Sequence, residues 1–243
     1  MKPWKLTCDG IFFCAADTLR QYDEMISVVI PTLNAERQLP RCFDSLIAAA
    51  VRGVVREVIV ADGGSADATL EIADAAGAHI VQAKKGRSMQ LAAGAAIAKS
   101  DWLLFLHPDT ALEQGWEAEV ESFIGQSVIE QPRAAVFRFA LEDFGSAARR
   151  AEAKAHVRTV LFALPYGDQG LLLPKRLYQK IGGYRALVDM EDADIVRRIG
   201  RRRLVGLRSR AINSARPHKS ALRGVALTLL HALRIPSRVL AKF

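Results

Sequence analysis

Residues 26–64 read ISVVIPTLNAERQLPRCFDSLIAAAVRGVVREVIVADGG, and this stretch decides the fold class. A short β-branched run at Ile26–Ile30 precedes apolar residues that recur at helical spacing up to about Ala50. A second β-branched run, Glu57–Ala61, ends at an Asp-Gly-Gly turn. Apolar strands on either side of a helix predict a parallel strand pair joined by a right-handed crossover.

The same alternation continues along the first half of the chain. A helix through Ala76 precedes a third strand at Ala78–Gln82, and a helix over Ser88–Lys99 precedes a fourth strand at Trp102–Leu106. The fourth strand has no polar alternation, which is typical of a strand buried on both faces. We therefore predict an α/β fold with a mostly parallel central sheet and helices on both faces.

The second half is less regular but continues the pattern. It predicts a helix carrying Trp116, Val120, Phe123 and Ile124, a strand at Ala134–Leu141, a helix over 145–163, a strand near Gly170–Leu173, a helix from Pro174 to Gly182-Gly183, a helix from about Glu191 and a last strand at Arg203–Leu207. The chain shows neither an internal repeat nor a low-complexity linker. One domain over 25–220 is therefore predicted, with an accessory extension at 1–24 and a basic amphipathic helix at 221–243.

The charge of the chain is strongly uneven. Its 243 residues are 50% apolar and 25% charged, with a net charge of +8. Residues 195–243 contain 13 Lys or Arg and no acid, which leaves 21 basic and 26 acidic residues in 1–194. A basic tail on a mildly acidic body favours a local anionic partner and argues against a nucleic-acid-binding coat. Three scattered cysteines, the absence of a signal-peptide pattern in 1–24 and apolar runs too short for a bilayer favour a cytoplasmic protein.

Polar residues follow three of the predicted strands at the point where each strand ends. They are Pro31, Thr32, Asn34 and Glu36 after the first strand, Asp62 after the second, and His107 and Asp109 after the fourth. Ligands of open α/β sheets bind outside the carboxyl ends of the strands, so these side chains should line one crevice. Taken singly, Asp62 could be only a turn residue and Asn34 only a helix cap.

Asp109 follows five apolar residues, so its carboxylate needs a partner there. A divalent cation bound together with a diphosphate would supply one. His107 could then be a second ligand, a hydrogen-bond donor to phosphate, or a purely structural histidine.

Three segments resemble the leading motifs of family 2 glycosyltransferases, which have the GT-A fold. They are Ser27–Asn34 (SVVIPTLN), Val60–Thr69 (VADGGSADAT) and Leu104–Thr110 (LFLHPDT). The resemblance runs from about Met25 to Arg203, and its details are similar to a short bacterial subgroup associated with arsenosugar biosynthesis and radical-SAM genes. It implies a metal-dependent, inverting transfer of a sugar from a nucleotide-diphosphate donor, of UDP or GDP type, to an acceptor hydroxyl.

The resemblance also implies roles for individual residues. Pro31, Thr32, Asn34 and Glu36 would line the nucleotide pocket, Asp62 would hydrogen-bond the base, and Arg87 and Gln90 would face the ribose or diphosphate. The family's metal motif is Asp-x-Asp with its last Asp on Mg²⁺ or Mn²⁺, and here it reads His107-Pro108-Asp109. Gly167, Asp168 and Gln169 would lie on the acceptor side, and Asp192, with Glu191 as the alternative, would be the catalytic base. Without the resemblance, two acids at a helix start could merely favour the helix dipole.

Competing functions stay open at this point. Because His107 replaces the first acid of the metal motif, the chain could be a catalytically impaired nucleotide-sugar-binding or membrane-associated scaffold protein. A sugar nucleotidyltransferase is less favoured, since it would normally need a Gly-rich phosphate loop after the first strand. The apolar stripe and interspersed Arg and Lys of 221–243 could dock on the protein itself or lie on an anionic membrane surface.

Overall fold

The computed structural model describes residues 4–6, 12–14, 25–129, 132–143, 145–146, 148–153, 155, 167–188 and 190–214. Two short strands, β1 (Trp4–Leu6) and β2 (Phe12–Cys14), pair with each other in antiparallel orientation. The expected accessory role of 1–24 stays a prediction. The helix expected at 221–243 lies outside the described residues.

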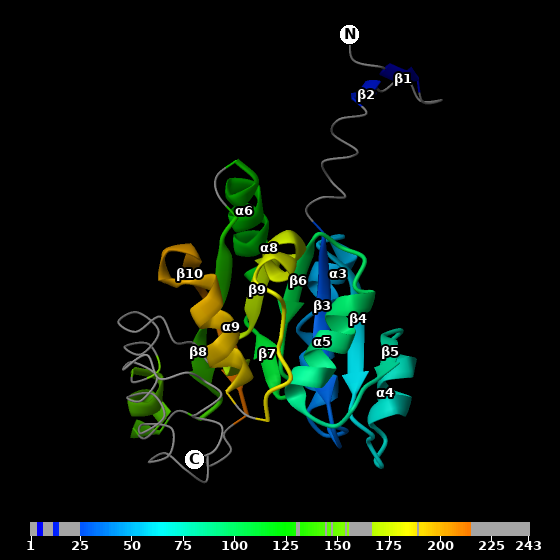
Figure 1. The fold of residues 1–243 in the computed structure, drawn as a ribbon, viewed down its shortest axis with the longest axis vertical. Coiled ribbons are helices and arrows are strands. Elements are labelled where there is room, and N and C mark those ends of the chain that lie inside the picture. Colours follow the sequence, from blue (N-terminus) through cyan, green and yellow to red (C-terminus); the bar gives the residue numbers. More distant parts are fainter. Residues whose placement is uncertain are drawn as a thin grey trace.

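An eight-stranded sheet forms the centre of the structure (Figure 1). Its strands lie in the order β5-β4-β3-β6-β9-β8-β10-β7. In chain order they are β3 (Ile26–Thr32), β4 (Val55–Asp62), β5 (His79–Gln82), β6 (Trp102–Phe105), β7 (Thr110–Leu112), β8 (Ala134–Leu141), β9 (Leu171–Pro174) and β10 (Leu204–Asn213). The strands β5, β4, β3 and β6 are parallel, as are β8 and β10, whereas β9 and β7 run antiparallel to their neighbours. The predicted mostly parallel α/β sheet is thus confirmed.

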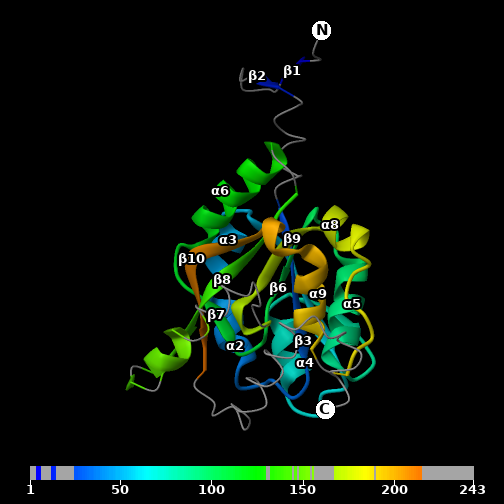
Figure 2. The same ribbon diagram turned by 60° about the vertical axis from the view of Figure 1, so that its left-hand side comes forward.

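Helices cover both faces of this sheet (Figure 2). One face packs against α2 (Leu39–Asp44), α3 (Ile47–Val51), α4 (Thr69–Ala75) and α6 (Trp116–Ile129), and the other against α5 (Arg87–Ile97), α8 (Lys175–Lys180) and α9 (Glu191–Ile199). A hydrophobic core lies on each face of the sheet, and successive residues of β3 pack into alternate cores, because strand side chains alternate between the two faces. Val28 and Ile30 join the first core, and Val29 joins the second.

The structure corrects several expected boundaries. The helix expected from Leu39 to about Ala50 is two short helices, and β7 was not expected at all. β3 continues through Pro31, because the pairing with β6 ends at Val29 and the missing N–H of proline removes no ladder bond there. β10 continues to Asn213, well past the predicted end at Leu207. Of the helix expected over 145–163, residues 148–153 are helical and 156–163 lie outside the described residues. Two 3₁₀ turns, η1 (Gly167–Gln169) and η2 (Arg201–Arg203), complete the described elements.

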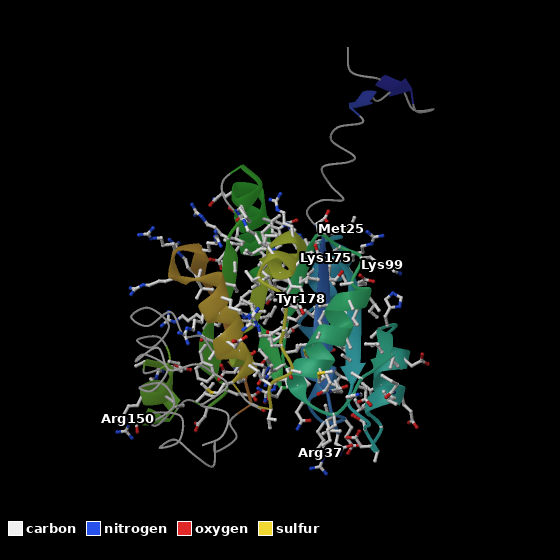
Figure 3. All side chains as sticks on the ribbon, viewed as in Figure 1. Met25, Arg37, Lys99, Arg150, Lys175 and Tyr178 are labelled. Atoms are coloured by element: carbon white, nitrogen blue, oxygen red, sulfur yellow. The ribbon has the colours of Figure 1, made fainter. Side chains whose placement is uncertain are left out.

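The two edges of the sheet are distinguishable in Figure 3. Met25 and Lys99 mark the edge at which β3 begins, and Arg37, in the loop after β3, lies at the opposite edge. Since β3, β4, β5 and β6 are parallel, their carboxyl ends all lie on the Arg37 side. The loops that carry the predicted site residues therefore start from one edge.

Candidate functional site

Asp62 accepts four hydrogen bonds at this edge. It is the last residue of β4 and has no exposed surface. One carboxylate oxygen accepts hydrogen bonds from Thr32 Oγ1 at 3.0 Å and Ser65 Oγ at 2.5 Å, and the other accepts from the backbone N–H groups of Gly64 and Ser65 at 2.8 and 2.9 Å. Burial alone would raise the pKa of Asp62, but these hydrogen bonds outweigh it and lower the pKa. Asp62 is therefore held as a carboxylate that shapes the loop after β4.

The loops after β3 and β4 are tied together by reciprocal bonds. Asn34 donates its backbone N–H to Ser65 Oγ at 2.9 Å, and its side-chain oxygen accepts from the N–H of Ala66 at 2.9 Å. Glu36 repeats the arrangement: its N–H donates to Asp67 at 3.1 Å, and its carboxylate accepts from the N–H of Ala68 at 3.2 Å. The predicted nucleotide-pocket residues thus hold two adjacent loops in a fixed relation.

Gln90 joins these loops to α5. Its side chain is buried, and its amide nitrogen donates to the carbonyls of Thr32 and Ala61 at 2.5 and 3.0 Å. These carbonyls lie at the carboxyl ends of β3 and β4. In this structure Gln90 fixes the position of α5 on the sheet, and Pro31 and Thr32 lie buried within β3.

Arg87, the first residue of α5, contacts the predicted catalytic acids at the start of α9. Its Nη1 atom lies 3.1 Å from Glu191 Oε1 and 3.7 Å from Asp192 Oδ2. Glu191 is almost fully buried, Asp192 is 13% exposed and Arg87 is half-exposed. The Tyr184 hydroxyl donates to Asp192 Oδ1 at 3.4 Å. Burial, and to a lesser extent the negative charges of Asp192 and Glu191, raise the pKa of Tyr184 well above its usual value, so this hydroxyl stays a neutral donor.

His107 and Asp109 lie in the loop between β6 and β7. Within the described residues the Nε2 atom of His107 is buried without a hydrogen-bond partner. Burial, and then the charge of Arg87, lower the pKa of His107 to about 3, so the imidazole is neutral. The Cys42 thiol donates a weak hydrogen bond to the carbonyl of His107 at 3.6 Å. Burial, and to a lesser extent the negative charge of Asp109, raise the pKa of the Cys42 thiol.

The predicted acceptor residues Gly167, Asp168 and Gln169 form η1. Gln169 is buried and donates to the carbonyl of Phe137 at 3.3 Å, which binds η1 to β8. The carbonyl of Asp168 accepts from the side-chain amide of Asn213, the last residue of β10, at 2.8 Å. The side-chain oxygen of Asn213 accepts a hydrogen bond at 2.7 Å from the Oγ1 atom of Thr110, which is the residue directly after Asp109.

The residues at His107 and Asp109 fit a divalent cation bound together with phosphates. The carboxylate of Asp109 is an oxygen ligand of the kind that Mg²⁺ and Mn²⁺ prefer, whereas the neutral imidazole nitrogen of His107, which has no partner among the described residues, is a ligand that Mn²⁺ takes more readily than Mg²⁺. Within the described ranges no group of three or more His, Cys, Asp or Glu could hold a metal. The remaining ligands would therefore come from substrate phosphate and water, as is common for Mg²⁺.

The structure thus brings together residues that the sequence could assign only separately. Arg87 contacts Glu191 and Asp192 across α5 and α9, and its charge acts on His107. Asn213 was missed because the last strand was expected to end at Leu207. If the strand had been predicted to end at Asn213, as β10 does, the rule that ligands bind beyond the carboxyl ends of strands would have identified Asn213 as a candidate.

The architecture places this protein in a known fold class. Glucosyl-3-phosphoglycerate synthase from Mycobacterium tuberculosis, solved with Mn²⁺, UDP-glucose and phosphoglyceric acid, superposes with a TM-score of 0.62 at 22% identity, over 97% of this chain and 89% of that chain. Residues 1–349 of TarS from S. aureus give a TM-score of 0.62 at 14% identity, over 86% of this chain and 63% of that one. The fold is therefore that of the GT-A glycosyltransferases.

Part of the chain matches a known family model. Residues 27–129 match the model of glycosyl transferase family 2, a segment that contains the loops after β3 and β4, α5, His107 and Asp109. A PGL/p-HBAD biosynthesis glycosyltransferase of Mycobacterium tuberculosis is 37% identical over 110 residues, which are 42% of each chain. A 4,4'-diaponeurosporenoate glycosyltransferase of Staphylococcus haemolyticus is 34% identical over 113 residues, 42% of this chain and 29% of that one. The chain thus matches less than half the length of these relatives.

Among the described residues, none of the helices combines the length and the apolar character needed to span a bilayer.

Proposed function

We propose that this protein is a glycosyltransferase that moves a sugar from a nucleoside-diphosphate donor to an acceptor hydroxyl. One observation carries the proposal: Arg87, a cation suited to a diphosphate, contacts the predicted acidic pair Glu191-Asp192, and its charge also acts on His107 in the predicted metal segment. A donor lying along the carboxyl edge would then have its phosphates near Arg87 and Asp109 and its sugar near the acids. The match of residues 27–129 to glycosyl transferase family 2 supports the same assignment.

On the donor side, Asp109 would hold Mg²⁺ or Mn²⁺ against the diphosphate, and His107 would lie beside the donor as a second ligand or as a hydrogen-bond donor to phosphate. When bound, the cation supplies electrostatic stabilisation of the leaving nucleoside diphosphate. The loops containing Asn34, Glu36 and Asp62 would shape the nucleoside pocket, since their cross-links keep it formed before the donor arrives. The donor would be of UDP or GDP type, and the glucosyl-3-phosphoglycerate synthase structure holds UDP-glucose.

On the acceptor side, Asp192 would take the proton of the attacking hydroxyl. Its carboxylate is only slightly exposed and is oriented by Tyr184 and Arg87, which suits a positioned general base. Attack on the face opposite to the diphosphate would invert the anomeric centre. Asp168 and Gln169 would line the acceptor pocket from η1. The narrower link to arsenosugar biosynthesis and radical-SAM genes stays a prediction.

Titration of UDP by calorimetry, with and without Mn²⁺, tests the donor side. Wild-type protein should bind UDP more tightly when Mn²⁺ is present, and Asp109→Asn should lose that gain while keeping its melting temperature. Asp74→Asn is the matched control, because Asp74 is an exposed carboxylate on α4. Equal effects of Mn²⁺ on wild type and Asp109→Asn would remove Asp109 from the metal site.

A screen of nucleotide sugars, scored by released nucleoside diphosphate, tests the reaction. With a productive pair in hand, Asp192→Asn should bind UDP and Mn²⁺ as wild type does but turn over about 100-fold more slowly. Full activity in Asp192→Asn would move the role of base to Glu191.

A second candidate is a nucleotide-sugar-binding protein without transferase activity. The specific observation in its favour is His107, which replaces the first acid of the family's metal motif. UDP and Mn²⁺ binding without product from any donor and acceptor would favour this function. Contact with an anionic membrane through 221–243 remains a prediction, to be tested by co-sedimentation with anionic vesicles at low and high salt.

A further inference from the structure

A buried amide lies where the donor and acceptor sides of the candidate site meet. Asn213 ends β10 and is 5% exposed. Its Oδ1 atom accepts from Thr110 Oγ1 at 2.7 Å, and its Nδ2 group donates to the carbonyls of Asp168 and Ala211 at 2.8 and 3.1 Å. Both amide hydrogens are therefore used, and the orientation of the amide is fixed by three partners on three elements.

Two of these partners, Thr110 and Asp168, adjoin or belong to the candidate site. Thr110 follows Asp109 directly, and its backbone N–H donates to the carbonyl of His107 at 3.1 Å. The residue after Asn213, Ser214, donates its N–H to the carbonyl of Asp109 at 3.3 Å. The end of β10 thus contacts this loop twice, through the Asn213 side chain at Thr110 and through the Ser214 N–H at Asp109.

The amide also sets the distance between this segment and η1. β7 and β10 pair with Thr110 opposite Asn213, so a change at Asn213 acts on the strand that begins one residue after Asp109. The bond to Asp168 carries the same constraint to the acceptor side. Thr110 is fully buried, so water cannot easily replace the lost bond.

We propose that Asn213 is a positioning residue that orients Asp109 for the cation and holds η1 in register with it, an inference that rests on the proposed function. Residues behind metal ligands fix the ligands' orientation, and their loss typically lowers metal affinity about 10- to 100-fold. Asn213 acts in this way through Thr110, without touching donor or acceptor. A purely architectural amide would instead change stability and leave metal affinity alone.

The test compares Asn213→Ala, Thr110→Val, their double variant and Thr110→Ser. Mn²⁺ affinity of the UDP complex and UDP affinity without metal are measured by calorimetry, together with melting temperatures. Mn²⁺ affinity should fall about 10-fold or more in each single variant, fall little further in the double variant, and recover in Thr110→Ser, which keeps the hydroxyl. UDP affinity without metal should stay within about 2-fold.

Ser27→Ala is the matched control. Ser27 is fully buried, donates to Glu57 at 2.6 Å and accepts from the N–H of Ser100 at 3.0 Å, at the opposite edge of the sheet. It should lower the melting temperature and leave Mn²⁺ affinity unchanged. If Thr110→Val and Asn213→Ala behave like this control, Asn213 is only architectural. If Asn213→Ala does not fold, the comparison of Mn²⁺ affinity between Thr110→Val and Thr110→Ser decides whether the Asn213–Thr110 contact positions Asp109. A wild type without Mn²⁺-dependent UDP binding would instead overturn the metal-dependent function itself.

Discussion

Replacing Asp62 by asparagine should destabilise the protein at neutral pH and should do so less as the pH falls. The new side chain could keep its one acceptor oxygen on the two backbone N–H groups of Gly64 and Ser65, while its amide nitrogen would face the hydroxyls of Thr32 and Ser65. The two backbone bonds would lose their charge assistance. Hydrogen bonds to a charged group stabilise by about 1 kcal/mol more than neutral ones, so we expect a loss of about 2 kcal/mol.

The pH dependence follows from the lowered pKa of Asp62. A depressed folded-state pKa contributes stability that is complete above the unfolded-state pKa of about 3.9 and is lost as the pH falls through the folded-state pKa. The difference between wild type and Asp62→Asn should therefore be full at pH 7 and pH 5 and shrink below about pH 4. Urea unfolding followed by tryptophan fluorescence at pH 7, 5, 4 and 3 measures it.

Asp74→Asn again serves as control, since this exposed carboxylate on α4 should give almost no difference at any of these pH values. A gap between wild type and Asp62→Asn that stays constant from pH 7 to pH 3 would refute the reasoning, because folding would then not lower the pKa of Asp62.

The same variant separates a structural role of Asp62 from a contact with the base. Thr32→Val removes one donor to Asp62 and leaves the carboxylate intact. If Asp62 acts only by shaping the loop, both variants should lower UDP affinity in proportion to their loss of stability. If it also contacts the base, Asp62→Asn should lose clearly more affinity than Thr32→Val at equal stability.

Two further predictions concern glycines that keep the helices of the site in place. A Cβ atom on Gly94 of α5 would clash with Val29 Cγ1, so Gly94→Ala should lower the free energy of unfolding in urea by about 1–3 kcal/mol. Val29→Ala should relieve part of that loss, and fully additive losses would contradict the packing. Gly183 has φ +58°, and a Cβ atom there would lie 2.8 Å from Tyr178 Cζ, whereas a Cβ atom on Gly182, at φ +79°, would meet no other atom within 4 Å. Gly182→Ala should therefore cost only the roughly 1 kcal/mol of backbone strain, and Gly183→Ala should cost more. The melting temperatures of the two variants measure the difference.

The strands β3, β4 and β6 could be predicted because they are largely buried and consist mainly of apolar residues. Only the first part of β10 was predicted, at Arg203–Leu207. Its continuation to Asn213 was missed, because the sequence there mixes apolar and charged residues and the register shifts between Gly206 and Arg210. The carboxylate of Glu119 on α6 accepts from the backbone N–H groups of Arg208 and Ser209 at 2.8 Å each and so stabilises this irregular stretch. A contact between residues about 90 positions apart leaves no periodic signal in the sequence.

The division between α2 and α3 has a similar origin. The apolar spacing through Leu46 continues across the break, so periodicity alone predicts one helix. Ser45 Oγ donates to the carbonyl of Cys42 at 2.7 Å, and the indole N–H of Trp116 donates to the carbonyl of Ser45 at 3.0 Å. A side chain of α6 thus satisfies a carbonyl that would otherwise continue the helix.

Within the candidate site, the position of Arg87 changes what its predicted role means. The sequence assigns it to the donor's ribose or diphosphate and assigns Glu191 and Asp192 to the acceptor, as independent tasks. The structure places its guanidinium 3.1 and 3.7 Å from these two acids, which are largely buried. Removing the cation would leave two carboxylates close together in a poorly hydrated place, so Arg87 stabilises the acidic pair electrostatically in addition to its predicted contact with the donor. A substitution at Arg87 should therefore alter both donor binding and the pH dependence of turnover, whereas a residue that only contacts phosphate would alter the first alone.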